Sequence, residues 1–100
     1  MNTATIKVPE NIDASKLPEE VIYKAFTIAV ELRLKELKKE LRKIDAKIKK
    51  YEKIYKMEYR DFEHHMDDSP KSHEDWIDWG FLIESRDVVV DELRNLGATA

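Results

Sequence analysis

Between Pro18 and Pro70 the chain contains neither glycine nor proline, and this stretch restricts the fold more than any other feature. Without these two residue types, the backbone carries no strong signal that would end a helix. Apolar residues recur through the stretch at alternating spacings of four and three, the pattern of a helix with one apolar seam. The seam residues are Val30, Leu34, Leu37, Leu41, Ile44, Ile48, Tyr51 and Tyr55. The sequence therefore predicts one long helix over residues 18–64.

Charges beside this seam indicate how it pairs. In a parallel pair of copies, Arg33 would lie opposite Lys38, and both are positive. Glu40 would lie opposite Asp45 in the same way, and both are negative. Because such contacts repel, we expect antiparallel packing, either against the chain's own C-terminal helix or against another subunit.

A second, shorter helix is predicted over residues 73–96, after a turn at residues 65–72 that contains Ser69 and Pro70. Ser72 and Asp75 have the spacing of a capping box, and Gly97 suits the left-handed position after a helix. This helix would be roughly 36 Å long, against roughly 68 Å for the first. The second helix is therefore too short to cover the whole of the first. The apolar segment "VIYKAFTIAV" (21–30) or part of the seam would stay exposed, so we expect a homo-oligomer or a dedicated protein partner.

The N-terminus carries the one strand signal. Residues 3–8, "TATIKV", alternate polar and apolar side chains, as in a strand with two different faces. The fold class expected from the whole sequence is therefore nearly all-α. It is a single domain, 1–100, in which an antiparallel helical hairpin or coiled coil follows a short N-terminal β-strand.

Charge is divided unevenly along the chain. Residues 31–60 carry twelve basic and six acidic residues, a net of +6, whereas residues 61–100 carry three basic and eleven acidic residues, a net of −8. Pairing between these two regions would neutralise both of them. The alternative is that the basic helix binds nucleic acid, with Tyr51, Tyr55 and Tyr59 stacking on bases.

Composition bears on location and chemistry. The chain has no cysteine and no glutamine but many Lys and Glu residues, a thermophile-like composition. No apolar run is long enough to span a membrane, so we expect a cytoplasmic protein. The histidines His64, His65 and His73 have no metal-site spacing, and no nucleophile or phosphate-loop motif is present. We therefore expect a non-enzymatic protein without a metal or another cofactor.

Both tryptophans fall in the segment "HEDWIDWGFLIES" (73–85), where the second helix begins among acidic residues. One interpretation is that they pack at the corner of the hairpin. The other is that they anchor a partner, because aromatic side chains rimmed by charge form hot spots at interfaces. The candidate partner-binding residues are Trp76, Trp79, Glu74, Asp75, Asp78 and Phe81.

The N-terminal "TIKVPE", the long Lys/Glu-rich helix and the late "EDWIDWGFLIES" resemble small prokaryotic, often archaeal, antitoxin-like proteins. The resemblance implies a protein that self-associates and whose acidic, aromatic C-terminal part covers a basic, toxin-like partner. It also implies an N-terminal part that dimerises and can bind operator DNA. Three hypotheses follow: an antitoxin-like inhibitor that self-associates and binds a partner protein, an autonomous structural antiparallel coiled-coil oligomer, and a nucleic-acid-binding protein that uses the basic helix.

Overall fold

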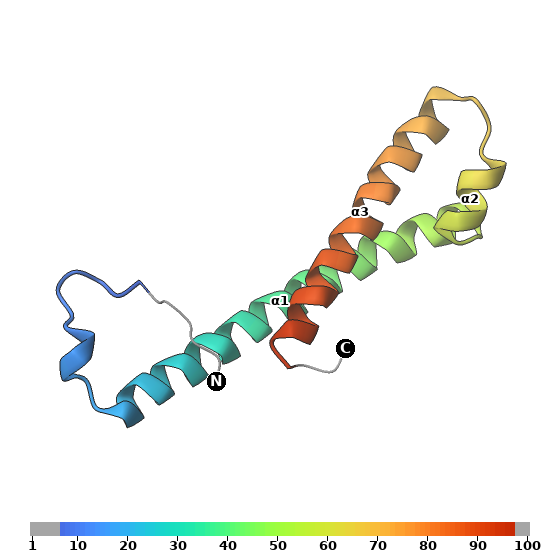
Figure 1. Cartoon of the computed structure of the whole chain (residues 1–100). Helices are drawn as coiled ribbons and strands as arrows, with labels where there is room; N and C mark the ends of the chain where they lie inside the picture. The colour runs from blue at the N-terminus through green and yellow to red at the C-terminus, as the bar shows by residue number, and fades with distance from the viewer. Residues whose placement is uncertain (1–6, 98–100) are drawn as a thin grey trace.

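The computed structural model describes residues 7–97, which form an elongated helical hairpin (Figure 1). A short 3-10 helix, η1 (Ala14–Lys16), precedes three α-helices: α1 (Glu19–Tyr55), α2 (Tyr59–His65) and α3 (Pro70–Asn95). α3 runs back along α1, and α2 forms the corner between them. The molecule measures 64 × 25 × 24 Å with a radius of gyration of 20.3 Å. A compact domain of this size would have a radius of gyration of about 13 Å.

The predicted antiparallel hairpin is confirmed, and the apolar seam of α1 lies against α3 of the same chain. Leu37, Ile44 and Ile48 are buried, and they pack in one core with Val89 and Leu93 of α3. Other seam residues are partly buried against the same core: Leu34, Leu41, Tyr51 and Tyr55. Val30 is half-buried at the N-terminal end of the seam. The sequence left open whether these residues contact the chain's own C-terminal helix or form an oligomer seam with another subunit, and from Leu34 to Tyr55 they form the hairpin's own core.

The predicted helix over residues 18–64 is broken in the structure. α1 ends at Tyr55, Lys56 adopts a left-handed conformation with φ 55° and ψ 36°, and a new helix begins at Tyr59. The break lets Phe62, which is 3% exposed, fold onto Tyr55 with a ring-centroid distance of 4.3 Å. A continuous helix would separate residues seven apart by a rise of roughly 10 Å. The contact with Phe62 therefore explains the break.

α3 begins at Pro70, three residues earlier than predicted. The N-cap is Ser69, whose hydroxyl oxygen accepts a hydrogen bond from the backbone N–H of Ser72 at 3.1 Å. Pro70 suits the first turn because its missing N–H would have had no helical partner there. The predicted capping box of Ser72 and Asp75 is therefore wrong. At the other end of α3, Gly97 has a φ of 86°, as predicted for this position.

The predicted N-terminal strand at residues 3–8 is not observed. Residues 3–6 lie outside the part that the structure describes, and residues 7 and 8 are in no regular element. A single strand needs a neighbour for its backbone groups, and between residues 7 and 97 there is no other strand that could provide one. For the described chain the fold class is therefore all-α.

A candidate protein-binding groove between α1 and α3

The centre of the hairpin is an aromatic cluster around Trp79, whose side chain is fully buried with 0% exposure. The ring of Tyr51 stacks on it at a centroid distance of 5.4 Å, and those of Tyr59 and Phe62 lie at 5.5 Å and 5.3 Å. All three helices thus contribute rings to one cluster. Trp79 was a candidate partner anchor, but the structure places it in the core of the hairpin.

Gly80 lets α3 approach this cluster closely. A Cβ atom at position 80 would lie 2.7 Å from the hydroxyl oxygen of Tyr59, which is too close for real atoms without a shift. The absence of a side chain at position 80 therefore leaves room for the Tyr59 hydroxyl against α3.

Asp75 was another candidate for contact with a partner, but it is only 4% exposed. The Tyr55 hydroxyl donates a hydrogen bond to one of its carboxylate oxygens, and Lys71 Nζ donates to the other at 3.0 Å. Burial tends to raise the pKa of Asp75, but the hydrogen bonds from Tyr55 and Lys71 outweigh it and hold the pKa below its ordinary value. Asp75 therefore joins the end of α1 to the first turns of α3.

Trp76 lies at the corner of the hairpin and is half-buried. Its indole N–H donates a hydrogen bond to Glu63 of α2 at 3.1 Å, and the His73 ring meets its edge at a centroid distance of 6.5 Å. This candidate therefore holds α2 against α3 and leaves only part of its ring to solvent.

The remaining candidates are Glu74, Asp78 and Phe81, and all three are exposed on α3. Phe81 is 69% exposed, with Ile77 at 63% and Val88 at 68% on the same outer face. Acidic side chains surround these three apolar residues: Glu74, Asp78, Glu84, Asp87 and Asp91. Monomeric proteins rarely expose a group of large apolar side chains, and such a group often marks a binding surface.

Phe81 also forms one wall of a groove of about 810 Å3 between α1 and α3, the α1–α3 groove. Its lining comprises Lys47, Lys50, Tyr51, Ile54, Tyr55, Lys71, Asp75, Asp78, Phe81 and Leu82. Ile54, 58% exposed, stands on the α1 wall and Phe81 on the α3 wall. The α1 wall carries Lys47 and Lys50, whereas the α3 wall carries Asp78 and the ion pair of Lys71 with Asp75. The sequence pattern singled out Tyr51 and Tyr55 of the α1 wall but not Ile54, because Ile54 lies outside the heptad seam.

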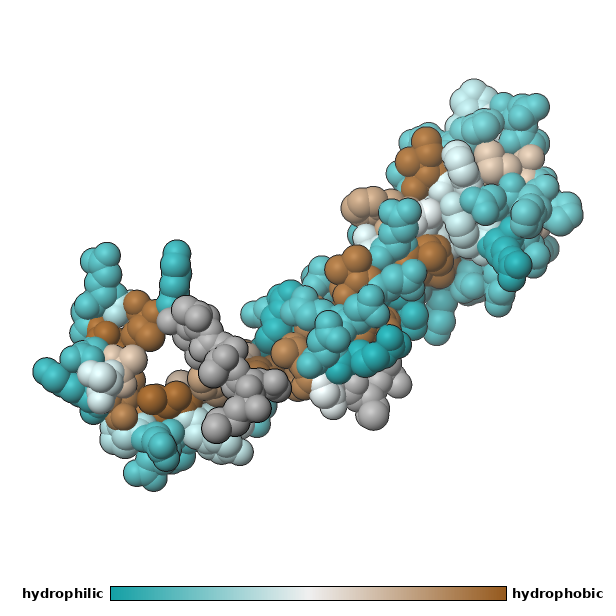
Figure 2. All heavy atoms as spheres, in the orientation of Figure 1, coloured by the Kyte–Doolittle hydropathy of each residue, from teal (hydrophilic) through white to brown (hydrophobic). Residues whose placement is uncertain are grey.

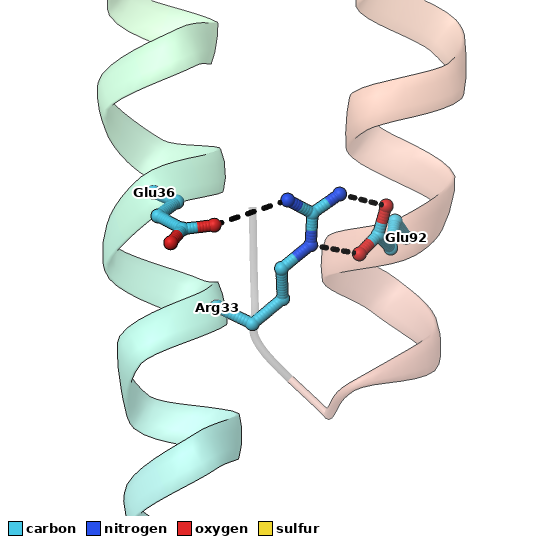
Figure 3. Close-up of polar contacts among 3 residues, drawn as sticks. All are labelled: Arg33, Glu36 and Glu92. Carbon is cyan, nitrogen blue, oxygen red and sulfur yellow. Dashed lines mark hydrogen bonds and ion pairs between the residues drawn. The ribbon is translucent and has the colours of Figure 1, made fainter.

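Two ion pairs join α1 to α3 outside the groove. Arg33 binds Glu92 through two hydrogen bonds of 2.5 and 2.8 Å and also contacts Glu36 of its own helix at 3.2 Å (Figure 3). These hydrogen bonds raise the pKa of Arg33 and lower that of Glu92. Further along, Arg86 of α3 binds Asp45 of α1 at 2.7 Å.

The sequence predicted that the basic and acidic regions would neutralise each other, but few direct ion pairs join them. Arg33 with Glu92 is one such pair, whereas the pair of Arg86 with Asp45 has the opposite polarity. Between residues 7 and 97, no lysine of α1 forms an ion pair with α3. The lysines of α1 therefore remain available to solvent or to a partner.

No family model matches the chain, and neither does a curated protein or a solved structure. In the part of the chain from residue 7 to 97, no three His, Asp or Glu side chains are grouped to hold a metal ion. None of the helices in that part is both long and apolar enough to cross a membrane.

Proposed function

We propose that the chain is a non-enzymatic protein-interaction module whose α1–α3 groove binds an amphipathic helix of a partner protein. The observation that carries this proposal is the exposure of Ile54 and Phe81 on opposite walls of one groove. Helices that bind in grooves insert a few apolar anchors between such walls. The half-buried rings of Tyr51 and Tyr55 provide a further apolar surface in this groove.

The charges around the groove select the partner. Lys47 and Lys50 on the α1 wall favour acidic residues along one flank of the bound helix. Asp78, together with the acidic outer face of α3, favours a basic surface on the other side. A partner with a basic surface next to an amphipathic helix satisfies both. A basic, toxin-like protein is such a partner, and binding it would make this chain an antitoxin-like inhibitor.

A crosslinking experiment tests the groove. A photoreactive phenylalanine analogue placed at position 81, in the cells from which the gene comes, should crosslink to one dominant foreign chain, identified by mass spectrometry. The same analogue at position 23, a 74% exposed tyrosine on the far end of α1, is the matched control and should not capture that chain.

The captured chain is then purified and titrated against variants. Replacing both Ile54 and Phe81 by serine should weaken its binding at least tenfold, because both apolar anchors are lost. Both side chains are more than half exposed, so the thermal midpoint should change little, which separates loss of binding from loss of fold. Equal binding by the variant and the wild type would refute the groove, and so would crosslinks only to this chain itself.

Nucleic-acid binding is the second candidate function, because one stripe of α1 opposite its seam is basic and exposed. The stripe consists of Lys35, Lys39, Arg42, Lys49 and Lys53. Binding through it would weaken steeply with salt, since each phosphate contact releases counterions. A protein that does not bind a heparin column at low salt would exclude this alternative and leave the groove proposal unaffected.

A further inference from the structure

The N-terminal part of α1 projects beyond the hairpin. Glu92, which pairs with Arg33, lies close to the C-terminal end of α3, and α1 continues for 14 residues before Arg33, from 19 to 32 (Figure 1). Large apolar side chains on this projecting segment are exposed: Val21 45%, Tyr23 74%, Phe26 47%, Ile28 56% and Leu32 58%. Figure 2 shows apolar side chains at the surface of this end of the molecule.

Four residues of the projecting segment form a second seam. Val21, Ala25, Ile28 and Leu32 follow a spacing of 4-3-4 and are all exposed. At roughly 100° per residue, this second seam lies on the side of α1 opposite the seam that α3 covers. A helix can therefore dock on it without displacing α3. The apolar stripe ends after Leu32, where Lys35 and Lys39 begin the basic face.

Charges along one flank of the second seam are self-complementary. Glu20, Lys24, Glu31 and Lys35 follow one another on that flank, and all four are exposed. Their signs read minus, plus, minus, plus. In an antiparallel second copy the order of these four residues is reversed. Each acidic residue of one copy then lies opposite a basic residue of the other. In a parallel pair, the matching flank positions would bring Glu31 of one copy against Glu36 of the other, and these repel.

We propose that the projecting segment is a homodimer interface, in which the second seams of two copies pack antiparallel. Val21 of one copy lies opposite Leu32 of the other, and Ala25 lies opposite Ile28. In this register, Lys24 faces Glu31 of the second copy, and Glu20 faces Lys35, each of them twice by symmetry. This surface lies outside the α1–α3 groove, so a dimer leaves both grooves open.

The size of this interface sets its strength. The second seam and its flanks cover about 14 residues of one helix, which is on the order of 500 Å2 per copy, below the ~800 Å2 of standard stable interfaces. The dimer should therefore be reversible and should dissociate on dilution. It should also weaken with added salt, because its flanking ion pairs are exposed to solvent.

Disulfide crosslinking tests the register, because the natural chain has no cysteine. Two single variants, Val21→Cys and Leu32→Cys, are mixed in a glutathione redox buffer. The mixture should form a disulfide-linked heterodimer, and each variant alone should stay largely uncrosslinked, because the two equivalent sites would be roughly 16 Å apart along the helices. Crosslinking of Val21→Cys to itself would show a parallel pair, and no crosslinking in the mixture would show no such contact. Either result overturns the proposal.

Sedimentation equilibrium tests the energetics. Leu32→Glu should raise the dimer dissociation constant at least tenfold, and Lys24→Glu should raise it about threefold, because each copy then presents like charges. Adding Glu31→Lys to Lys24→Glu exchanges the charges and should restore wild-type affinity. Tyr23→Ser, on the opposite side of the segment, is the control and should change the constant less than twofold. A chain that stays monomeric at all concentrations, or loses as much affinity from Tyr23→Ser as from Leu32→Glu, would contradict the interface.

Discussion

A single buried carboxylate, that of Asp75, joins the two long helices at the closed end of the hairpin. It accepts hydrogen bonds from Tyr55, the last residue of α1, and from Lys71, one turn earlier in α3. A carboxylate that is only 4% exposed costs free energy to desolvate, and these two donors compensate for that cost. The result is a polar contact inside an otherwise aromatic core.

The stability of the hairpin should fall in acid, partly through Asp75. Because its pKa is lower in the folded than in the unfolded chain, its contribution is complete above the unfolded value of about 4. That contribution is lost as the pH falls from there through the lowered pKa. At pH 7, Asp75→Asn should reduce the free energy of unfolding by about 1–2 kcal/mol, measured by urea denaturation.

The same substitution provides its own control, because an asparagine resembles a protonated aspartate. The difference in stability between the wild type and Asp75→Asn should therefore shrink as the pH approaches 3. A difference that stays constant between pH 7 and pH 3 would show that the charge of Asp75 contributes nothing to the fold.

Among the helices, the heptad pattern predicted which face of α1 is buried, and the charges beside the seam predicted that the packing is antiparallel. It could not predict where α1 ends, because no glycine or proline marks the break at Lys56. A left-handed residue other than glycine costs about 1–2 kcal/mol locally, and only a tertiary contact compensates for it. Here that contact is the packing of Phe62 against Tyr55 and Trp79. Such a contact is visible only once the whole hairpin is assembled.

Replacing Lys56 by glycine should stabilise the protein. Glycine adopts the φ of 55° at this position without steric strain, so the free energy of unfolding should rise by about 0.5–1 kcal/mol, after subtracting glycine's greater freedom in the unfolded chain. Urea denaturation followed by circular dichroism measures the change.

Lys53→Gly, one turn earlier within α1, is the matched control for this change. Here glycine lies in a regular helix, and stability should fall by about 1 kcal/mol. If both variants were destabilised equally, then α1 would continue through position 56 in solution, contrary to the structure.

On the scale of the molecule, the sequence predicted that one stretch of the long helix would lack cover. It could not say which candidates face outward. Near its start, α3 carries apolar residues over more than half of its circumference. Trp79 and Phe81 therefore have similar sequence surroundings. The pairing of α1 with α3 separates them, burying Trp79 and leaving Phe81 69% exposed. The candidate groove depends on this pairing, because Ile54 and Phe81 are 27 residues apart in the chain.

Two parts of α1 should therefore differ in local stability against unfolding. Residues 37–51 of α1 are held by the core, whereas residues 21–32 contribute nothing to that core, and an isolated segment of this length is marginally helical in water. Hydrogen exchange followed by mass spectrometry should show fast exchange of amides 21–32 in dilute protein and slow exchange of amides 37–51.

Repeating the exchange experiment at several protein concentrations shows whether a second copy stabilises residues 21–32. A second copy that binds only the folded segment stabilises it by mass action, so protection of residues 21–32 should rise with concentration while that of 37–51 stays constant. In the Leu32→Glu variant the concentration dependence should disappear, but the difference between the two segments should remain. If amides 21–32 were already as protected as 37–51 in dilute wild-type protein and in this variant, the projecting end would be stable without a second copy. The oligomer would then not be needed to order this end of the helix.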